Sequence, residues 1–173
     1  PNLINSLLLV DPVIFRWYSK YLMCIARILK LKVPNAYLSQ NARKRRKKWP
    51  NLEVLMKSYE GRGAFKTWEK DFLMNYLYAG TIKSKNGTSL SCDPEWESRN
   101  FKAFDSVNII DTIKKLKTPV KLLLAEKAST TKAVGTFNFN NNNFYQVIEN
   151  STHFVPMEFP EIVQKEILNL IAE

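Results

Sequence analysis

The residues best suited to acid–base chemistry are one imidazole and two carboxylates. His153 is the only histidine among 173 residues, and it follows the apolar, strand-like run "FYQVIEN". Asp11 and Glu126 each follow another apolar run of the same kind. A carboxylate that contacts an imidazole fixes its tautomer and stabilises its protonated form, which allows the histidine to act as a general base. The three residues therefore form the first candidate site.

The elements around these residues predict a parallel sheet with its ligand-binding edge at this site. Three apolar runs separated by long connections are typical of an α/β protein. The last segment begins with Pro160 and Glu161, which suit the first turn of a helix. Its inward face is predicted to carry Ile162, Val163, Ile167, Leu170 and Ile171. Because ligands bind outside the carboxyl ends of parallel strands, we expect the three candidate residues to share one edge. The simpler alternative is that each only caps its own strand or loop.

The chain divides by pattern into a first strand at 1–12, a long insert at 13–104 and a final α/β part at 105–173. The insert lacks strand patterning and is predicted to be mainly helical. Within it, Asn86-Gly87 is a turn signal that favours a loop or hairpin. In the final part, Ser106 is expected to cap a helix, and an asparagine-rich tract before the last strand is expected to be a surface loop.

Composition narrows the class of protein. Two cysteines make no disulfide framework, so an intracellular, reducing compartment is expected. No apolar run approaches the ~20 residues that a membrane-spanning helix needs. The net charge of +10 favours acidic partners without identifying one. Metal-ligand clusters and phosphate-cradling loops are absent from the sequence, so neither a metal nor a cofactor is expected.

The strongest charge cluster is "RKRRKK", which consists of Arg43, Lys44, Arg45, Arg46, Lys47 and Lys48. Such a run could bind nucleic acid, act as a nuclear signal or contact anionic lipid. The interleaved aromatic residues of an RNA-binding module are missing around it, so no specific nucleic acid is expected. We favour the interpretation that the run is a solvated helix face. If it has a binding partner, we expect peripheral contact with anionic lipid.

Three segments, in this order and spacing, resemble the C-terminal half of an α/β-hydrolase. "STHFVPMEFPE" resembles the family's catalytic-histidine loop, and "LKTPVKLLLAEK" resembles the strand before it. "LINSLLLVDPVI" resembles the strand just after the nucleophile elbow, from which the cap domain arises. The insert, with "LSCDPEWESRNF", is similar to the cap of fungal, partly peroxisomal, lipase-like members. The resemblance implies three C-terminal parallel strands with a helical cap, the N-terminal half of the fold being missing.

The resemblance also implies roles for the candidate residues. His153 matches the catalytic histidine. The family's usual aspartate position falls near Ala128, but some lipases place the acid after the strand that follows the nucleophile, and Asp11 matches that variant. Asp11 is therefore our first choice and Glu126 the alternative. The simpler interpretations are a turn residue for Asp11 and, for Glu126, a solvated carboxylate paired with Lys127.

The activity implied is that of a serine hydrolase, an esterase or lipase that acts on apolar acyl esters. No Gly-x-Ser-x-Gly elbow occurs in the sequence, so the chain as given is expected to be catalytically incomplete, with its nucleophile upstream of Pro1. The aromatic residues expected to line a substrate pocket, although core packing explains most of them equally well, are Phe65, Trp68, Phe72 and Tyr76. One alternative is a non-enzymatic, truncated binding or structural protein. Another is an epoxide hydrolase or dehalogenase, if the upstream nucleophile is an aspartate.

Overall fold

The computed structural model describes residues 4–15, 18–29, 34–103, 117–132 and 144–172. They belong to two compact units, which are described separately. Unit 1 combines Pro1–Lys20 with Asn108–Glu173, and unit 2 is Tyr21–Val107. The helix predicted to start at Ser106 and the asparagine-rich tract lie almost wholly outside the described residues.

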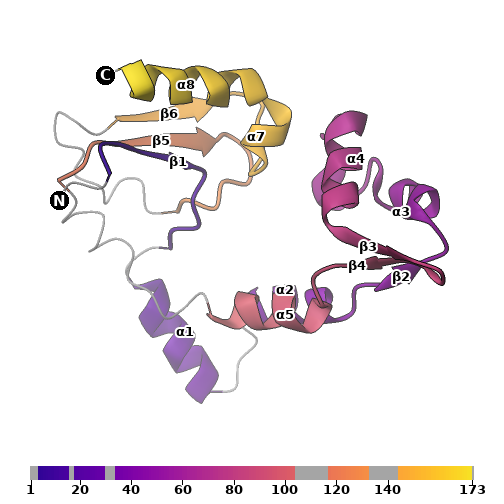
Figure 1. The fold of residues 1–173 in the computed structure, drawn as a ribbon. Helices are drawn as coiled ribbons and strands as arrows, with labels where there is room; N and C mark the ends of the chain where they lie inside the picture. Colours follow the sequence, from indigo (N-terminus) through magenta and orange to yellow (C-terminus); the bar gives the residue numbers. More distant parts are fainter. Residues whose placement is uncertain (1–3, 16–17, 30–33, 104–116, 133–143, 173) are drawn as a thin grey trace. The chain divides into compact units, whose positions relative to one another are not determined.

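Unit 1 is built on a parallel sheet of three strands, as predicted (Figure 1). The strands are β1 (Leu7–Val10), β5 (Val120–Ala125) and β6 (Phe144–Ile148), in the spatial order β1-β5-β6. Leu9 lies opposite Leu122, and Leu122 lies opposite Tyr145. This register brings the carboxyl ends of all three strands to the same edge, which is the edge that the sequence predicted for the site.

The central strand β5 is buried on both faces, which explains its continuous apolar sequence. Leu123 and Ala125 face one side, together with Ile148 of β6. Val120, Leu122 and Leu124 face the other. The short helix α7 (Val155–Glu158) and the longer α8 (Pro160–Ala172) follow β6. Figure 1 shows α8 running beside the sheet, and its first turns pack on the face that carries Leu123.

The predicted inward face of α8 is correct in its first turn and wrong at Ile167 and Ile171, while Leu170 is half-buried. Ile162 and Val163 pack on the sheet, but Ile167 and Ile171 are 45% and 76% exposed. Glu166 is buried instead, because Lys121 of β5 forms an ion pair with its carboxylate. A hydrophobic pattern cannot indicate a charged residue on an inward face, since its burial depends on a partner from another element.

Unit 2 is mainly helical, and it also contains an antiparallel sheet of β2 (Lys48–Trp49), β3 (Thr81–Ser84) and β4 (Gly87–Leu90), in the order β2-β4-β3. The hairpin interpretation of Asn86-Gly87 is confirmed, since Asn86 lies in the turn between β3 and β4 and Gly87 is the first residue of β4. The two-residue strand β2, inside and just after the basic run, was not predicted. In chain order the elements of the insert are α1 (Ser19–Ile28), α2 (Pro34–Arg43), β2 (Lys48–Trp49), α3 (Leu52–Tyr59), the 3-10 turn η1 (Gly63–Phe65), α4 (Lys70–Ala79), β3 (Thr81–Ser84), β4 (Gly87–Leu90) and α5 (Pro94–Ala103).

The core of unit 2 joins α3, α4 and this small sheet. Its buried members are Trp49, Leu55, Met56, Leu73 and Leu77. The two leucines of α4 lie four residues apart, on one helix face. Across the described ranges, no helix is both long enough and apolar enough to cross a membrane.

Gly87 is expected to be the glycine of this unit whose substitution lowers stability most. Substitution of Gly61 serves as the comparison that tests the cause. Both have positive φ, 111° for Gly87 and 66° for Gly61. An added Cβ would lie 2.3 Å from the carbonyl oxygen of Trp49 at Gly87 but would meet nothing within 4 Å at Gly61. Gly61→Ala should therefore lower the free energy of unfolding by about 1 kcal/mol, because alanine must adopt the left-handed conformation there. Gly87→Ala should cost about 2–4 kcal/mol. Hydrogen exchange at the amides of β4 measures the loss of stability in both variants. Equal losses would show that the close approach of the added Cβ to the Trp49 carbonyl is relieved without cost.

Candidate active site

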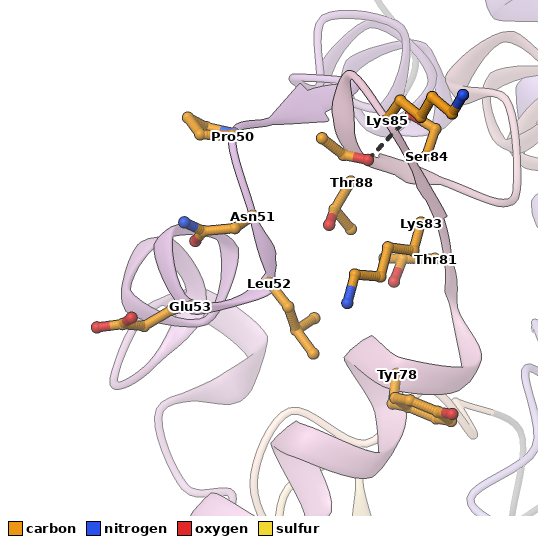
Figure 2. A pocket seen from close by; sticks show the side chains of 11 residues that line it. Pro50, Asn51, Leu52, Glu53, Tyr78, Thr81, Lys83, Ser84, Lys85 and Thr88 are labelled. Atoms are coloured by element: carbon orange, nitrogen blue, oxygen red, sulfur yellow. Dashed lines mark hydrogen bonds between the residues drawn. The ribbon is translucent and has the colours of Figure 1, made fainter.

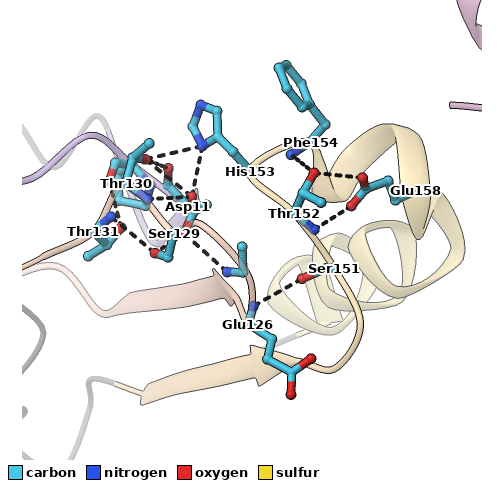
Figure 3. A network of polar contacts seen from close by, with 12 residues as sticks. Asp11, Glu126, Ser129, Thr130, Thr131, Ser151, Thr152, His153, Phe154 and Glu158 are labelled. Carbon is cyan, nitrogen blue, oxygen red and sulfur yellow. Dashed lines mark hydrogen bonds and ion pairs between the residues drawn. The ribbon is translucent and has the colours of Figure 1, made fainter. Parts of the chain in front are cut away.

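The candidate site lies where β1 and β6 end, on either side of the central strand. Asp11 directly follows β1, and its N–H donates to the carbonyl of Leu123 at 2.7 Å. Its φ of 38° is left-handed, a conformation that aspartate tolerates better than most residues. His153 lies in the loop between β6 and α7. Figure 3 shows its ring reaching toward the end of β1, so the sheet places both side chains at one point.

His153 and Asp11 contact each other directly. Nδ1 of the imidazole lies 2.8 Å from Oδ2 of the carboxylate. The Asp11 side chain is fully buried, whereas the imidazole is 37% exposed. An ionised carboxylate can only accept, so we assign the ring proton to Nδ1. Nε2 is then left with a lone pair, which is the arrangement that a general base requires.

The buried Asp11 carboxylate is held by donors from β5 and from the loop that follows it. Its Oδ1 accepts hydrogen bonds from the N–H of Ala125 at 3.1 Å and from the hydroxyl of Ser129 at 2.5 Å. Its Oδ2 accepts from the N–H of Thr130 at 3.0 Å, in addition to the imidazole. Burial raises the pKa of Asp11, but the hydrogen bonds from Ser129, Thr130, His153 and Ala125 together lower it below its ordinary value. Asp11 therefore stays ionised beside the ring.

Three consecutive hydroxyl residues, Ser129, Thr130 and Thr131, fasten the end of β1 to this loop. Thr130 Oγ1 donates to the Asp11 carbonyl at 2.8 Å and lies 3.1 Å from Nδ1 of His153. Ser129 Oγ accepts the N–H of Thr131 at 3.1 Å, which directs its own proton toward Asp11. Thr131 Oγ1 donates to the carbonyl of Pro12 at 2.6 Å. The sequence analysis did not identify these residues. The sequence feature that could have identified them is the run of three hydroxyl residues just after Ala128, the position near which the family pattern places the acid.

The loop that carries His153 is fixed by Glu158. The Glu158 carboxylate accepts the N–H of Thr152 and its hydroxyl, both at 2.6 Å. The N–H of Phe154 in turn lies 3.4 Å from Thr152 Oγ1. The residues on both sides of the histidine are thus tied to the start of the helical region, which limits the movement of the ring.

Glu126, the alternative acid, is engaged elsewhere. Its carboxylate accepts the N–H of Asn150 at 2.7 Å, and the side chain is exposed (Figure 3). Lys127 donates to the side chain of Asn150 and not to Glu126. Ser151, the serine nearest to His153 in sequence, is buried and donates to the carbonyl of Ile148 at 2.7 Å. The expected contact with the imidazole is therefore made by Asp11, while the catalytic roles of both residues stay predictions.

The predicted substrate-lining aromatic residues lie in unit 2, where three of them form one ring cluster. Phe65 lies 5.0 Å from Trp68 and 5.4 Å from Tyr76 between ring centroids, and Trp68 lies 5.4 Å from Tyr76. Phe72 is half-buried on α4. Figure 2 shows a separate hollow in the same unit, between α3 and the β3–β4 hairpin, and none of the four residues lines it. Their contact with a substrate stays a prediction.

The basic run forms ion pairs within unit 2. Only Arg43 belongs to a helix, so the helix-face interpretation is wrong for the rest of the run. Its partners lie near the start of α5, about fifty residues later, where the chain supplies a matching set of acidic residues. The pairs are Arg43–Glu95 at 2.6 Å, Arg45–Glu97 at 2.5 Å and Lys47–Asp93 at 3.0 Å. Contact with anionic lipid stays a prediction.

Within the described ranges, no group of three or more histidine, cysteine, aspartate or glutamate residues could hold a metal ion.

Comparison with known proteins identifies the fold through structure alone. A scan against protein-family models finds no match, and a search of curated proteins finds no relative. Among solved structures, E-2-(acetamidomethylene)succinate hydrolase matches with a TM-score of 0.76 at 14% identity, over 100% of this chain. The peroxisomal alpha-beta-hydrolase Lpx1 from Saccharomyces cerevisiae matches with a TM-score of 0.66 at 18% identity, over 99% of this chain. A thioesterase domain from the curacin biosynthetic pathway matches with 0.61 at 12% identity, over 95%.

These matches show that the chain has part of the α/β-hydrolase fold. It spans 59%, 47% and 58% of the three solved chains, that is, about half to three fifths of their lengths. The predicted fold class is confirmed. The identities are low enough that the likeness extends to the fold and not to any one activity.

Ser129→Ala should make unit 1 more sensitive to acid. Because the pKa of Asp11 is lowered in the folded chain, its contribution to stability is present above the ordinary carboxyl pKa and is lost as pH falls through the lowered pKa. Loss of the Ser129 donor should raise the pKa of Asp11, so acid unfolding should begin at a higher pH. Carbon-13 NMR of the Asp11 carboxyl measures the shift directly.

A matched control for this change is Ser91→Ala. Ser91 is an exposed serine of unit 2 whose hydroxyl donates to the neutral carbonyl of Gly80 at 2.8 Å. This substitution should leave the titration of Asp11 unchanged. An unchanged Asp11 titration in Ser129→Ala itself would mean that the hydroxyl does not stabilise the carboxylate.

Proposed function

We propose that residues 1–173 are the C-terminal portion of a serine hydrolase that cleaves esters of apolar acyl groups. The observation that carries the proposal is the 2.8 Å contact between Nδ1 of His153 and the buried Asp11 carboxylate, at the carboxyl ends of parallel strands. A general base needs a partly exposed ring, because its free nitrogen must reach the substrate. It also needs an ionised partner on the other ring nitrogen, because that partner fixes the tautomer.

The reaction would use this pair in two stages. A serine from a part of the protein that precedes Pro1 would attack the ester carbonyl carbon, and Nε2 of His153 would accept the serine proton. The tetrahedral intermediate would then release the alcohol, which takes that proton from Nε2 and leaves an acyl-enzyme. Water would attack the acyl-enzyme by the same route, with Nε2 accepting the proton of water and returning it to the serine. Asp11 would stay ionised throughout and stabilise the protonated ring.

Two lines of argument support this activity over other uses of the fold. The similar solved structures include a succinate-derivative hydrolase and a thioesterase domain, which supports hydrolysis in general. The preference for apolar esters rests on the resemblance of the insert to lipase-like caps. We keep an intracellular location within the proposal, because two cysteines make no disulfide framework and favour a reducing compartment. The choice between cytoplasm and peroxisome stays open, and the peroxisomal option rests on the resemblance to lipase-like members.

Substitutions at the pair should separate catalysis from folding. In the full-length protein, His153→Gln should lower the turnover of a p-nitrophenyl acyl ester by several orders of magnitude, because the base is lost. Asp11→Asn should lower it by about 10⁴-fold, since the amide can donate to Nδ1 and would stabilise the wrong tautomer. Glu126→Gln, which changes an equivalent strand-end carboxylate that has no contact with the ring, should leave turnover within a few-fold of the parent. Circular dichroism establishes that each variant is folded.

The alternatives predict different results in the same experiment. Turnover within tenfold of the parent in His153→Gln would refute the assignment of the base. A protein that opens epoxides, is inert toward esters and is not labelled by a fluorophosphonate would indicate an aspartate nucleophile. A folded protein with neither activity would favour the non-enzymatic interpretation.

A further inference from the structure

Unit 2 contains a hollow that belongs to neither the His153 site nor the predicted aromatic pocket. It has a volume of about 700 Å³ and lies between the N-terminus of α3 and the β3–β4 hairpin (Figure 2). Tyr78, at the end of α4, also lines it. Pockets that bind small molecules have volumes of about 300–1,000 Å³, so this hollow is large enough for one.

Thr88 places a buried polar group in this hollow. The residue is 4% exposed, and Figure 2 shows its side chain directed into the space between Leu52 and Lys83. Its hydroxyl makes no hydrogen bond to any residue that the structure describes. The hydroxyl is therefore available to hydrogen-bond a polar group that enters the hollow.

The surroundings of Thr88 are positively charged. Figure 2 shows the Lys83 ammonium group directed into the same space, and Lys83 has no ion-pair partner among the described residues. Glu53 also lines the hollow, but its carboxylate pairs with Lys57 at 2.8 Å and points to the other side of α3. With that pair neutral, Lys83 leaves the space around Thr88 with a net positive charge. Lys85 also lines the hollow, but Figure 2 shows its side chain directed away from this space.

The first turn of α3 adds N–H donors to this field. Asn51 caps the helix: its side chain accepts the N–H of Val54 at 2.9 Å, and its carbonyl accepts that of Leu55 at 3.2 Å. The N–H groups of Leu52 and Glu53 have no hydrogen-bond partner within the described parts of the chain. Free N–H groups at the positive end of a helix favour an anion.

We propose that this hollow binds the carboxylate or phosphate group of a small amphiphilic ligand. Lys83, the hydroxyl of Thr88 and the free N–H groups at the start of α3 would hold the anionic group. Leu52 and the ring of Tyr78, which is 77% exposed, would contact its apolar body. The site lies wholly within unit 2 and does not depend on the proposed hydrolase activity.

The test is a titration of the intact, nitrogen-15-labelled protein, followed by NMR. Inorganic phosphate, acetate and octanoate are added separately at constant ionic strength. We expect saturable shifts at the amides of Leu52, Glu53 and Thr88 with at least one of these anions. Octanoate should bind more tightly than acetate, because only octanoate reaches Leu52 and Tyr78. Preference between phosphate and octanoate then identifies the class of anionic group.

Variants of the hollow decide whether the shifts report this site. Lys83→Gln and the isosteric Thr88→Val should each weaken binding about tenfold, which is the expected loss of one hydrogen bond to a charged group. Lys66→Gln removes the same charge from the same unit at an exposed position outside the hollow and should change affinity less than threefold. Because Lys83 is exposed, its variant should fold normally. Shifts that do not saturate, or equal weakening in Lys66→Gln and Lys83→Gln, would overturn the proposal.

Discussion

The organisation of unit 1 depends on the hydrogen bonding of one buried carboxylate. Asp11 has no solvent exposure, and a buried charge is tolerated only when donors replace its water. Those donors come from the end of β5, from the loop at 129–131 and from the imidazole of His153. Segments more than a hundred residues apart in the chain therefore meet around the two oxygens of a single side chain.

This requirement also explains the local backbone around the site. Asp11 and Ala128 both have positive φ, 38° and 54°, which are unfavourable conformations for residues with a side chain. At these two bends, the chain after β1 and the chain after β5 turn toward each other. A parallel bridge between Ile14 and Thr131 continues the contact beyond the strands. The hydrogen bonds to Asp11 offset the cost of the bends, so ionisation and loop geometry support each other.

Unit 2 satisfies its charges in a different way. Its basic run is neutralised in part by acidic residues near α5, and these pairs tie β2 and the end of α2 to a distant helix. Lys83, on the hairpin, has no such ion pair among the described residues, although Glu53 lies across the same hollow. Glu53 pairs with Lys57 along its own helix instead. The local i, i+4 pair thus leaves the hairpin cation available for a ligand.

The sequence by itself determined the three strands, their parallel order in an α/β sheet and the loop position of His153, because each depends on local hydrophobic pattern and turn chemistry. It also limited the candidate acid to Asp11, the first choice, or Glu126. The tertiary structure alone decided which of the two contacts the imidazole. That choice depends on the bend at Ala128 and on donors from Ser129 and Thr130, and alanine carries no local signal for such a bend. The same reason applies to the inward Glu166, the pairs of the basic run and the strand β2, since the partner that stabilises each comes from a distant part of the chain.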